Sequence, residues 1–465
     1  MYTAEIKVGY LRFAITLDPD QKPMTHAREA IPTRYQIVCH AVPVILANIG
    51  VSLTGIADTA VMGRMSDPVF LSATAVGATF FSTLYWAFGF LRMSTGGMVA
   101  QAYGAGDNTA QRRVVWRALC LAGAIGLVAV MLQGPLLSLG LAAIENEGHL
   151  HALIADYAGV RIWSAPAILG LFVLYGALVG RQHMRLLLTL QLVQTGLNVV
   201  LNIAFYTFTD LDVRGVALAT VIADYTALTL ALVYMADVLR GETADWWEWL
   251  LDSVALRRLF SLSGHLFVRS LFLTGAYFWM TAAGTQLGVS VVAANAILLL
   301  LVTFTAHFLD GFAHAAEALV GQAIGARNQE ALNAAIMRSA ELSVIVAILM
   351  TMVFVIGGGH LIDAMTTEPG VREATRQWLP WAWMLPLAGV GSFLLDGIFI
   401  GATDMRSMRD TVAIACIGFV VATWLLLPIW GNHGLWGAYM LMQILRALGL
   451  GMQMPKLMRT VLSSP

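Results

Sequence analysis

The chain has 465 residues, of which 58% are hydrophobic and 12% are charged, and its formal net charge is −1. Soluble proteins carry about twice that fraction of charged residues, so the composition excludes a soluble globular protein. The near-zero net charge gives no reason to expect a nucleic-acid partner. The cysteines Cys39, Cys120 and Cys416 lie in or beside apolar segments and show neither a disulfide framework nor metal-ligand spacing.

Residues 1–34 mix acidic and basic side chains and lack the apolar core of a cleavable signal peptide, so we expect a cytosolic extension there. Apolar segments long enough to cross a membrane as helices follow. Because lipid cannot hydrogen-bond to an irregular backbone, all of them should be helical. The predicted spans are 35–63, 69–95, 110–135, 153–180, 186–208, 214–240, 257–286, 290–320, 332–358, 375–401, 409–430 and 433–455.

Lysine and arginine are concentrated in the two tails and in alternate connections between the spans. The connections on the opposite side contain Arg64, Arg214, Arg372 and Arg376. By the positive-inside rule, both termini are expected in the cytosol, with the chain spanning the inner (cytoplasmic) membrane many times.

The second half of the chain repeats the first at an offset of about 220 residues, with the order of the matching segments preserved. Residues 101–108 read QAYGAGDN and residues 322–328 read QAIGARN. Trp163–Pro166 matches Trp383–Pro386, and Gly176–Gly180 matches Gly397–Gly401. Each copy holds an even number of spans, so the two copies should have the same orientation and enclose a cavity between them.

These features predict an all-α membrane protein with twelve transmembrane helices in two six-helix lobes. The tryptophans at 246, 247 and 249 suggest an interfacial anchor in the connection between the lobes. The expected domains are the extension 1–34, the first lobe 35–240, a linker 241–256, the second lobe 257–455 and a cytosolic tail 456–465.

The predicted spans of the first lobe contain a set of polar side chains. At 1.5 Å of rise per residue, several of them lie roughly 6 to 15 Å from the outer ends of their helices, so they converge in the outer half of the lobe. Asn198 and Asn202 are four residues apart and share one helix face. The set consists of Asp58, Tyr157, Arg161, Asn198, Asn202, Thr220 and Asp224.

Asp58 is the most costly member of this set, since an acid at the centre of a membrane helix costs about 2.5–3.5 kcal/mol. It is either a structural ion-pair partner of Arg64 or Arg161, or a titratable group that exchanges a proton. The surrounding neutral oxygens also suit Na⁺, but a single carboxylate favours H⁺. Pro43, in the same helix, is either a static kink or a hinge.

In the second lobe, His307, Asp310, His314 and Glu317 form one stripe of a predicted helix. The stripe is about 15 Å long, too long for one ion, so we expect no metal and no cofactor. It is a polar wall of the cavity, a second proton-handling group or a hydrogen-bond network, and Asp396 is a candidate member of the same network.

The paired QA-x-GA segments, LDGFAHAAEALVG at 309–321 and LDGIFIGAT at 395–403 resemble the multidrug and toxic compound extrusion (MATE) family, DinF branch. The resemblance implies export of cationic or amphipathic organic compounds driven by H⁺ or Na⁺. It places the ion site on Asp58, Tyr157, Asn198, Asn202 and Thr220, and the helix-1 proline on Pro43. The family has an acid where this chain has Asn202, which favours H⁺ and makes Asp224 a candidate replacement.

We therefore expect a proton-coupled multidrug exporter, monomeric and lipid-embedded, that binds small organic molecules and is not an enzyme. The first alternative is a flippase for lipid-linked precursors, which convergence of Arg161, Arg269 and Arg446 on the cavity would favour. The second alternative is a membrane-embedded enzyme that uses the His/Asp/Glu stripe of residues 307–317.

Overall fold

The computed structural model describes residues 2–8, 11–17, 31–62, 68–142, 148–241 and 246–463. The first half contains α1 (Arg34–Met62), α2 (Pro68–Ala87), α3 (Phe90–Ala105), α4 (Asn108–Met131), α5 (Gln133–Ala142), α6 (His149–Arg161), the 3₁₀ turn η2 (Ile162–Ser164), α7 (Ala165–Gly180), α8 (Met184–Phe208) and α9 (Asp212–Tyr234). The connection contains α10 (Ala236–Leu239) and α11 (Trp246–Leu250). The second half contains α12 (Ser253–Thr285), α13 (Val289–Gly325), α14 (Gln329–Met365), α15 (Pro369–Gly401), α16 (Met405–Trp430) and α17 (Asn432–Ser463).

Each predicted span coincides with a helix or with a helix that is interrupted once, which confirms the predicted helical membrane fold. Within the described residues, 11 helical segments are long and apolar enough to cross a membrane. The remaining predicted span lies in α17, which is less apolar because it carries Gln443, Arg446 and Gln453.

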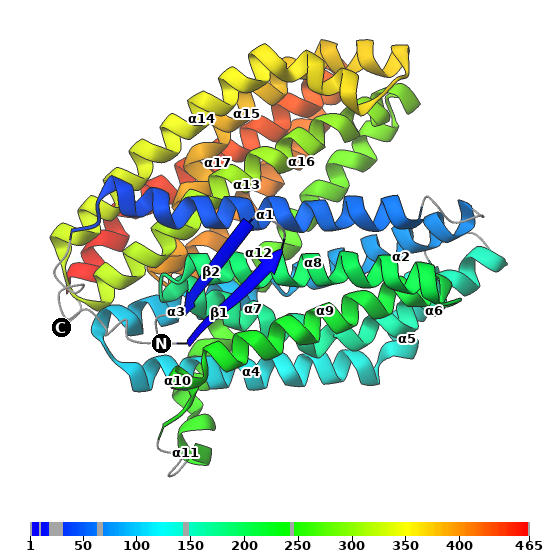
Figure 1. Ribbon diagram of the computed structural model, residues 1–465. Coiled ribbons are helices and arrows are strands. Elements are labelled where there is room, and N and C mark those ends of the chain that lie inside the picture. The colour runs from blue at the N-terminus through cyan, green and yellow to red at the C-terminus, as the bar shows by residue number, and fades with distance from the viewer. Residues whose placement is uncertain are drawn as a thin grey trace.

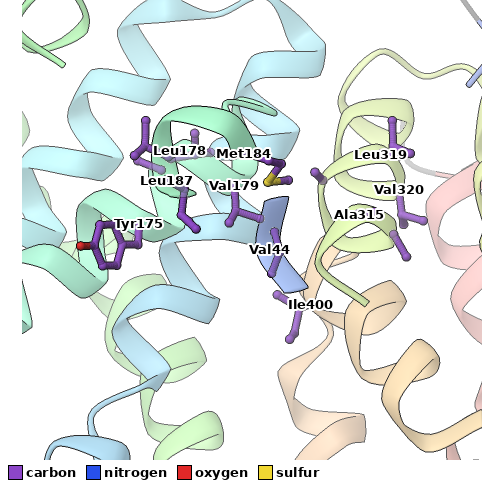
Figure 2. Close-up of a cluster of buried hydrophobic side chains, with 14 of the residues drawn as sticks. Val44, Tyr175, Leu178, Val179, Met184, Leu187, Ala315, Leu319, Val320 and Ile400 are labelled. Atoms are coloured by element: carbon purple, nitrogen blue, oxygen red, sulfur yellow. The ribbon is translucent and has the colours of Figure 1, made fainter. Parts of the chain in front are cut away.

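The helices form two groups that approach each other at one end and diverge at the other (Figure 1). α1 lies between the groups and packs against both α8 and α13. The C-terminal ends of α3 and α13 cross at the narrow end, which we call the crossing end; the C-terminal ends of α7 and α15 lie beside them. The buried core is continuous there, and Figure 2 shows Val44 of α1, Val179 of α7 and Leu319 of α13 in one cluster.

Besides the single interruptions of other spans, two features of the fold were not predicted. The N-terminal extension contains an antiparallel hairpin of β1 (Tyr2–Val8) and β2 (Leu11–Leu17), in which Tyr2 is opposite Leu17. The fourth span is not one regular helix, because Pro166 near the start of α7 has no N–H to donate to the preceding turn. The 3₁₀ turn η2 therefore replaces α-helix at Ile162–Ser164.

The internal repeat is visible in the close packing of glycines. A Cβ on Gly176 would overlap the carbonyl oxygen of Arg92, and a Cβ on Gly397 would overlap that of Ala313. These are equivalent positions of the two copies, both 221 residues apart (176 and 397, 92 and 313). Glycine is required at such points because the backbones of two helices touch. The same contact thus joins α3 to α7 and α13 to α15.

A buried amide pair connects α13 and α17. Asn295 Nδ2 donates to Asn432 Oδ1 at 2.8 Å, and Asn432 Nδ2 donates back to Asn295 Oδ1 at 2.9 Å. The indole N–H of Trp436 donates to the same Asn295 oxygen at 2.8 Å. All three hydrogen bonds depend on Asn295.

We predict that Asn295→Ala lowers the free energy of unfolding by at least about 2 kcal/mol, because it leaves buried groups of Asn432 and Trp436 unpaired. Thermal unfolding of the purified protein in detergent measures the loss. Thr303→Ala is the control on the same helix, since the Thr303 hydroxyl donates only to the carbonyl of Leu299 among the described residues. Equal unfolding temperatures for the two variants would contradict the prediction.

Candidate functional site

Hydrogen bonds connect the predicted polar residues of α8 and α9. Asn202 Nδ2 donates to Asn198 Oδ1 at 3.2 Å, and Asn198 Nδ2 donates to Thr220 Oγ1 at 2.9 Å. The Thr220 hydroxyl donates to the carbonyl of Val216 at 3.1 Å. Asn198 and Asn202 are 2% and 1% exposed, so the interior of the first half is polar at this point.

One helical turn further along the same two helices, Asp224 is the centre of a second group of polar contacts. Gln194 Nε2 donates to Asp224 Oδ1 at 2.7 Å, and the Tyr175 hydroxyl donates to Gln194 Oε1 at 2.9 Å. Arg161 Nη1 lies 3.2 Å from Asp224 Oδ2, which also accepts from the Ser164 hydroxyl. Asp224 is 2% exposed, so this carboxylate is buried with its own counter-ion.

The break in the fourth span directs Arg161 and Ser164 towards Asp224. At the break, the Tyr225 hydroxyl donates to the carbonyl of Trp163 at 3.1 Å, and the Tyr85 hydroxyl donates to that of Arg161 at 3.4 Å. The carbonyls released by the irregular turn thus keep partners, as the membrane interior requires.

Tyr157 lies one turn before Arg161 on α6, is 3% exposed, and packs against α2. A Cβ on Gly77 would lie 2.5 Å from the Tyr157 ring, so the glycine leaves room for the aromatic side chain. The Arg161 guanidinium lies 5.8 Å from the centroid of the Phe81 ring and 5.2 Å from that of Tyr85. The structure therefore brings together Tyr157 and Arg161, both predicted, with two aromatic rings that were not.

Asp58 lies in the last two turns of α1, and its side chain is outside the described residues. α1 packs along α8, the helix that carries Asn198 and Asn202. Pro43 is buried within α1, which continues as one helix through this residue. The residues of the predicted ion site thus occupy adjacent helices.

The predicted stripe on α13 is divided among different partners. Glu317, 1% exposed in its side chain, pairs with Arg92 of α3 at 3.3 Å, so this ion pair joins the two halves. His314 is hydrogen-bonded through Nδ1 to the carbonyl of Asp310, within its own helix. His307 is partly exposed on α13. Asp396 of α15 instead pairs with Arg269 and Arg446.

Among the described residues, no group of three or more His, Cys, Asp or Glu side chains is arranged to hold a metal ion. Hydrogen bonds and the ion pair thus give the members of the stripe different partners, although Asp310, His314 and Glu317 all interact electrostatically with Arg92. Its members belong to the junction between the halves, to the helix itself and to the protein interior.

Reciprocal contacts between the halves close the crossing end. Gln101 Nε2 of α3 donates to the carbonyl of Gly401 at 2.9 Å, and the equivalent Gln322 of α13 accepts from Gln182 Nε2. A Cβ on Gly104 would overlap the carbonyl oxygen of Gln322, and a Cβ on Gly325 would overlap that of Gln101. The paired QA-x-G segments of the sequence are therefore the two sides of one tight helix crossing.

Comparison with known proteins identifies the family. The MatE family model matches residues 43–204 and 266–426, which is most of the chain. The DNA damage-inducible protein F of Escherichia coli is 39% identical over 414 residues, which cover 88% of this chain and 89% of that protein. The chain belongs to the MATE family of membrane transporters.

More distant MATE relatives and solved structures agree. The probable multidrug resistance protein NorM of Bradyrhizobium diazoefficiens is 25% identical over 82% of both chains. The MATE transporter VcmN of Vibrio cholerae superimposes with a TM-score of 0.81 at 19% identity, over 92% of this chain and 97% of that one. A MOP superfamily transporter from Pyrococcus furiosus superimposes with a TM-score of 0.78 at 18% identity, over 95% and 98%. The MATE fold therefore extends over nearly the whole chain.

Besides the aromatic rings of Phe81 and Tyr85, four residues of the site were missed by the sequence reasoning. Gln194 precedes Asn198 by four residues, so the helical spacing that paired Asn198 with Asn202 contained the signal for it. Ser164 and Tyr175 gave no such signal, because they reach the site through the break in the fourth span. Arg92 lies near the end of a predicted span, where an arginine is ordinarily interpreted as an interfacial residue.

Proposed function

We propose that this protein exports cationic or amphipathic organic compounds in exchange for protons. Support comes from membership of the MATE family and from relatives named as multidrug resistance or export proteins, including MepA of Staphylococcus aureus at 22% identity. The proposal places the chain in the inner membrane as a monomer with both termini in the cytosol, as the distribution of lysine and arginine favours.

The choice of H⁺ over Na⁺ rests on the donors in the first half. Asn202 supplies an amide where the resemblance predicts an acid, and Asn198 and Thr220 are also neutral. Asp224 is already paired with Arg161 and accepts two further hydrogen bonds. Asp58 is then the carboxylate that exchanges the proton, which needs one titratable group and no cage of charged oxygens.

In the proposed cycle, Asp58 is deprotonated while the cavity holds a solute. Protonation from the outer side rearranges α1 near Pro43 and releases the solute. α1 suits this role because it lies between α8, which carries the amide pair, and α13 of the other half. A change in α1 can therefore be transmitted to both halves at once.

Asp58→Asn is expected to abolish substrate-driven proton movement, because the amide cannot exchange a proton. Proteoliposomes that contain a pH-sensitive dye and carry an imposed pH gradient report the movement, with and without Na⁺. Asp156→Asn is the matched control, since Asp156 is an exposed acid of the same half that pairs with Arg214 at 2.8 Å. A variant at position 58 that still dissipates the gradient upon substrate addition would refute the assignment.

A second candidate function is the flipping of lipid-linked precursors, which is favoured by the convergence of Arg269 and Arg446 on Asp396. Arg161, the third arginine of that hypothesis, does not join them, since it pairs with Asp224 in the other half. Flipping of a fluorescent phospholipid-linked sugar in proteoliposomes without a pH gradient distinguishes this function from proton-driven export.

A further inference from the structure

A single buried carboxylate is shared by two arginines inside the second half. Arg446 Nη2 of α17 lies 2.7 Å from Asp396 Oδ2, and Arg269 Nη2 of α12 donates to the same oxygen. The side chains of Arg269, Asp396 and Arg446 are 6%, 10% and 5% exposed. We call these three residues the arginine pair cluster. Ionisable groups at this depth are costly and generally mark functional sites.

The cluster has one positive charge more than it has negative charges. Glu317 of α13 has a partner of its own, since it pairs with Arg92. Asp310 of α13 interacts electrostatically with Arg92, and also with Asp396 and both arginines of the cluster, but it forms no ion pair within 4.0 Å among the described residues. Asp310 can therefore offset the extra positive charge of the cluster only at a distance longer than that of an ion pair.

The cluster also presents unpaired hydrogen-bonding groups. Arg269 Nε, Arg446 Nε and Asp396 Oδ1 are buried and have no hydrogen-bond partner among the described residues. Arg446 Nη1 is held by Gln443 Oε1 at 2.7 Å, so the orientation of this guanidinium is fixed. A fixed guanidinium with a free N–H matches the geometry of a carboxylate, sulfonate or phosphate oxygen.

The cluster lies beside the junction of the two halves and next to apolar side chains. Arg269 Nη1 lies 3.9 Å from the sulfur of Met93, which belongs to α3 of the first half. The Arg446 guanidinium lies 5.9 Å from the centroid of the Phe393 ring. An anionic group bound here would therefore have apolar surface next to it, as the tail of an amphipathic molecule requires.

We propose that the arginine pair cluster is a binding subsite for the oxyanionic head group of an amphipathic solute. Its role in transport rests on the proposed export function, whereas binding itself does not. The substrates would then include amphipathic anions or zwitterions, whose oxyanion is held by the free N–H groups of Arg269 and Arg446.

The test compares two probes that differ only in the sign of the head group, 1-octanesulfonate and octyltrimethylammonium. Isothermal titration calorimetry is performed on the full chain in phosphatidylcholine nanodiscs, with empty nanodiscs subtracted. The wild-type protein is expected to bind the sulfonate, whereas binding of the ammonium compound, which has no oxyanion, should not depend on the cluster. No measurable binding of the sulfonate to the wild type overturns the proposal.

Arg446→Gln leaves Asp396 paired one to one with Arg269 and removes the extra charge. This variant is expected to bind the sulfonate at least about tenfold more weakly, with no loss of ammonium binding. Arg446→Lys should restore most of the sulfonate affinity, because it retains the charge. Arg214→Gln removes one positive charge at an exposed site and is the control. Unchanged sulfonate affinity in the Arg446→Gln protein contradicts the proposal. If that variant does not fold, the test rests on sulfonate binding by the wild type and by Arg446→Lys, and loss of binding in Arg446→Lys contradicts the proposal.

Repeating the titration in phosphatidylglycerol nanodiscs distinguishes the source of the anion. Weaker sulfonate binding there in the wild type, but not in Arg446→Gln, supports a lipid head group as the ligand. Unchanged binding supports a free amphiphile. Transport is measured separately in proteoliposomes, so the expected binding pattern without any solute movement refutes export and leaves the subsite intact.

Discussion

Gly325→Ala is expected to reduce transport by at least about tenfold, because the added methyl group disfavours the conformation in which the two halves meet at the crossing end. A Cβ at this position overlaps the carbonyl oxygen of Gln101, which is backbone and cannot rotate away. Inserting a methyl group into such a contact costs about 1–3 kcal/mol. That cost falls only on the conformation in which α3 and α13 cross, so the population of this conformation decreases.

Spin labels at Thr109 and Gln329, exposed residues near the starts of α4 and α14, report the separation at this end. The labels are attached to cysteines after Cys39, Cys120 and Cys416 have been replaced. Double electron–electron resonance should show a longer distance in Gly325→Ala than in the wild type, together with the loss of transport.

Gly275→Ala is the matched control, since a Cβ there has no neighbouring atom within 4 Å and the change is again from glycine to alanine inside a helix. Its transport rate and label distances should equal those of the wild type. Wild-type transport and label distances in Gly325→Ala would show that the crossing is not required for the cycle.

The sequence was sufficient to predict the helices and the repeat, because both depend on local composition. Long apolar segments have only one stable backbone structure in lipid. The QA-x-G segments and the Gly176 and Gly397 motifs recur because the same backbone contacts occur in both copies. The break at Ile162–Ser164 could not be predicted from Pro166 alone. The corresponding proline of the second half, Pro386, lies within a continuous helix, α15, so the same sequence feature gives two different backbones. Whether a membrane proline interrupts its helix depends on neighbouring partners, here the hydroxyls of Tyr85 and Tyr225.

In the candidate site, too, the sequence predicts which residues share a helix face but not which other helix they contact. Helical spacing alone placed Asn198 and Asn202 on one face, and the structure joins them by a hydrogen bond. Spacing also placed the α13 stripe on one face, but Glu317 contacts α3 while His314 contacts its own helix. A shared face does not specify which neighbouring helix each residue meets. Those contacts are set by helix packing, which single-sequence periodicity does not contain.

The buried pair of Arg161 and Asp224 should be the most sensitive polar contact for stability. Asp224→Ala is expected to lower the free energy of unfolding by about 3–5 kcal/mol, because it leaves a buried arginine without a counter-ion. The side chains of Arg161 and Asp224 are 12% and 2% exposed, so water replaces little of the lost interaction. Thermal unfolding in detergent measures the effect. Asp156→Ala is the control, because its partner Arg214 is exposed and such pairs contribute about 0–1 kcal/mol.

Replacing both partners separates a structural role from a role in coupling. Arg161→Met combined with Asp224→Leu removes both charges, and buried pairs replaced in this way regain most of their stability. We expect this double variant to be more stable than Asp224→Ala and to retain substrate-driven proton movement, because the proposal assigns the proton to Asp58. A stable double variant that no longer moves protons would instead transfer the coupling role to Asp224. Gln194, which donates to Asp224 Oδ1, would then position that carboxylate.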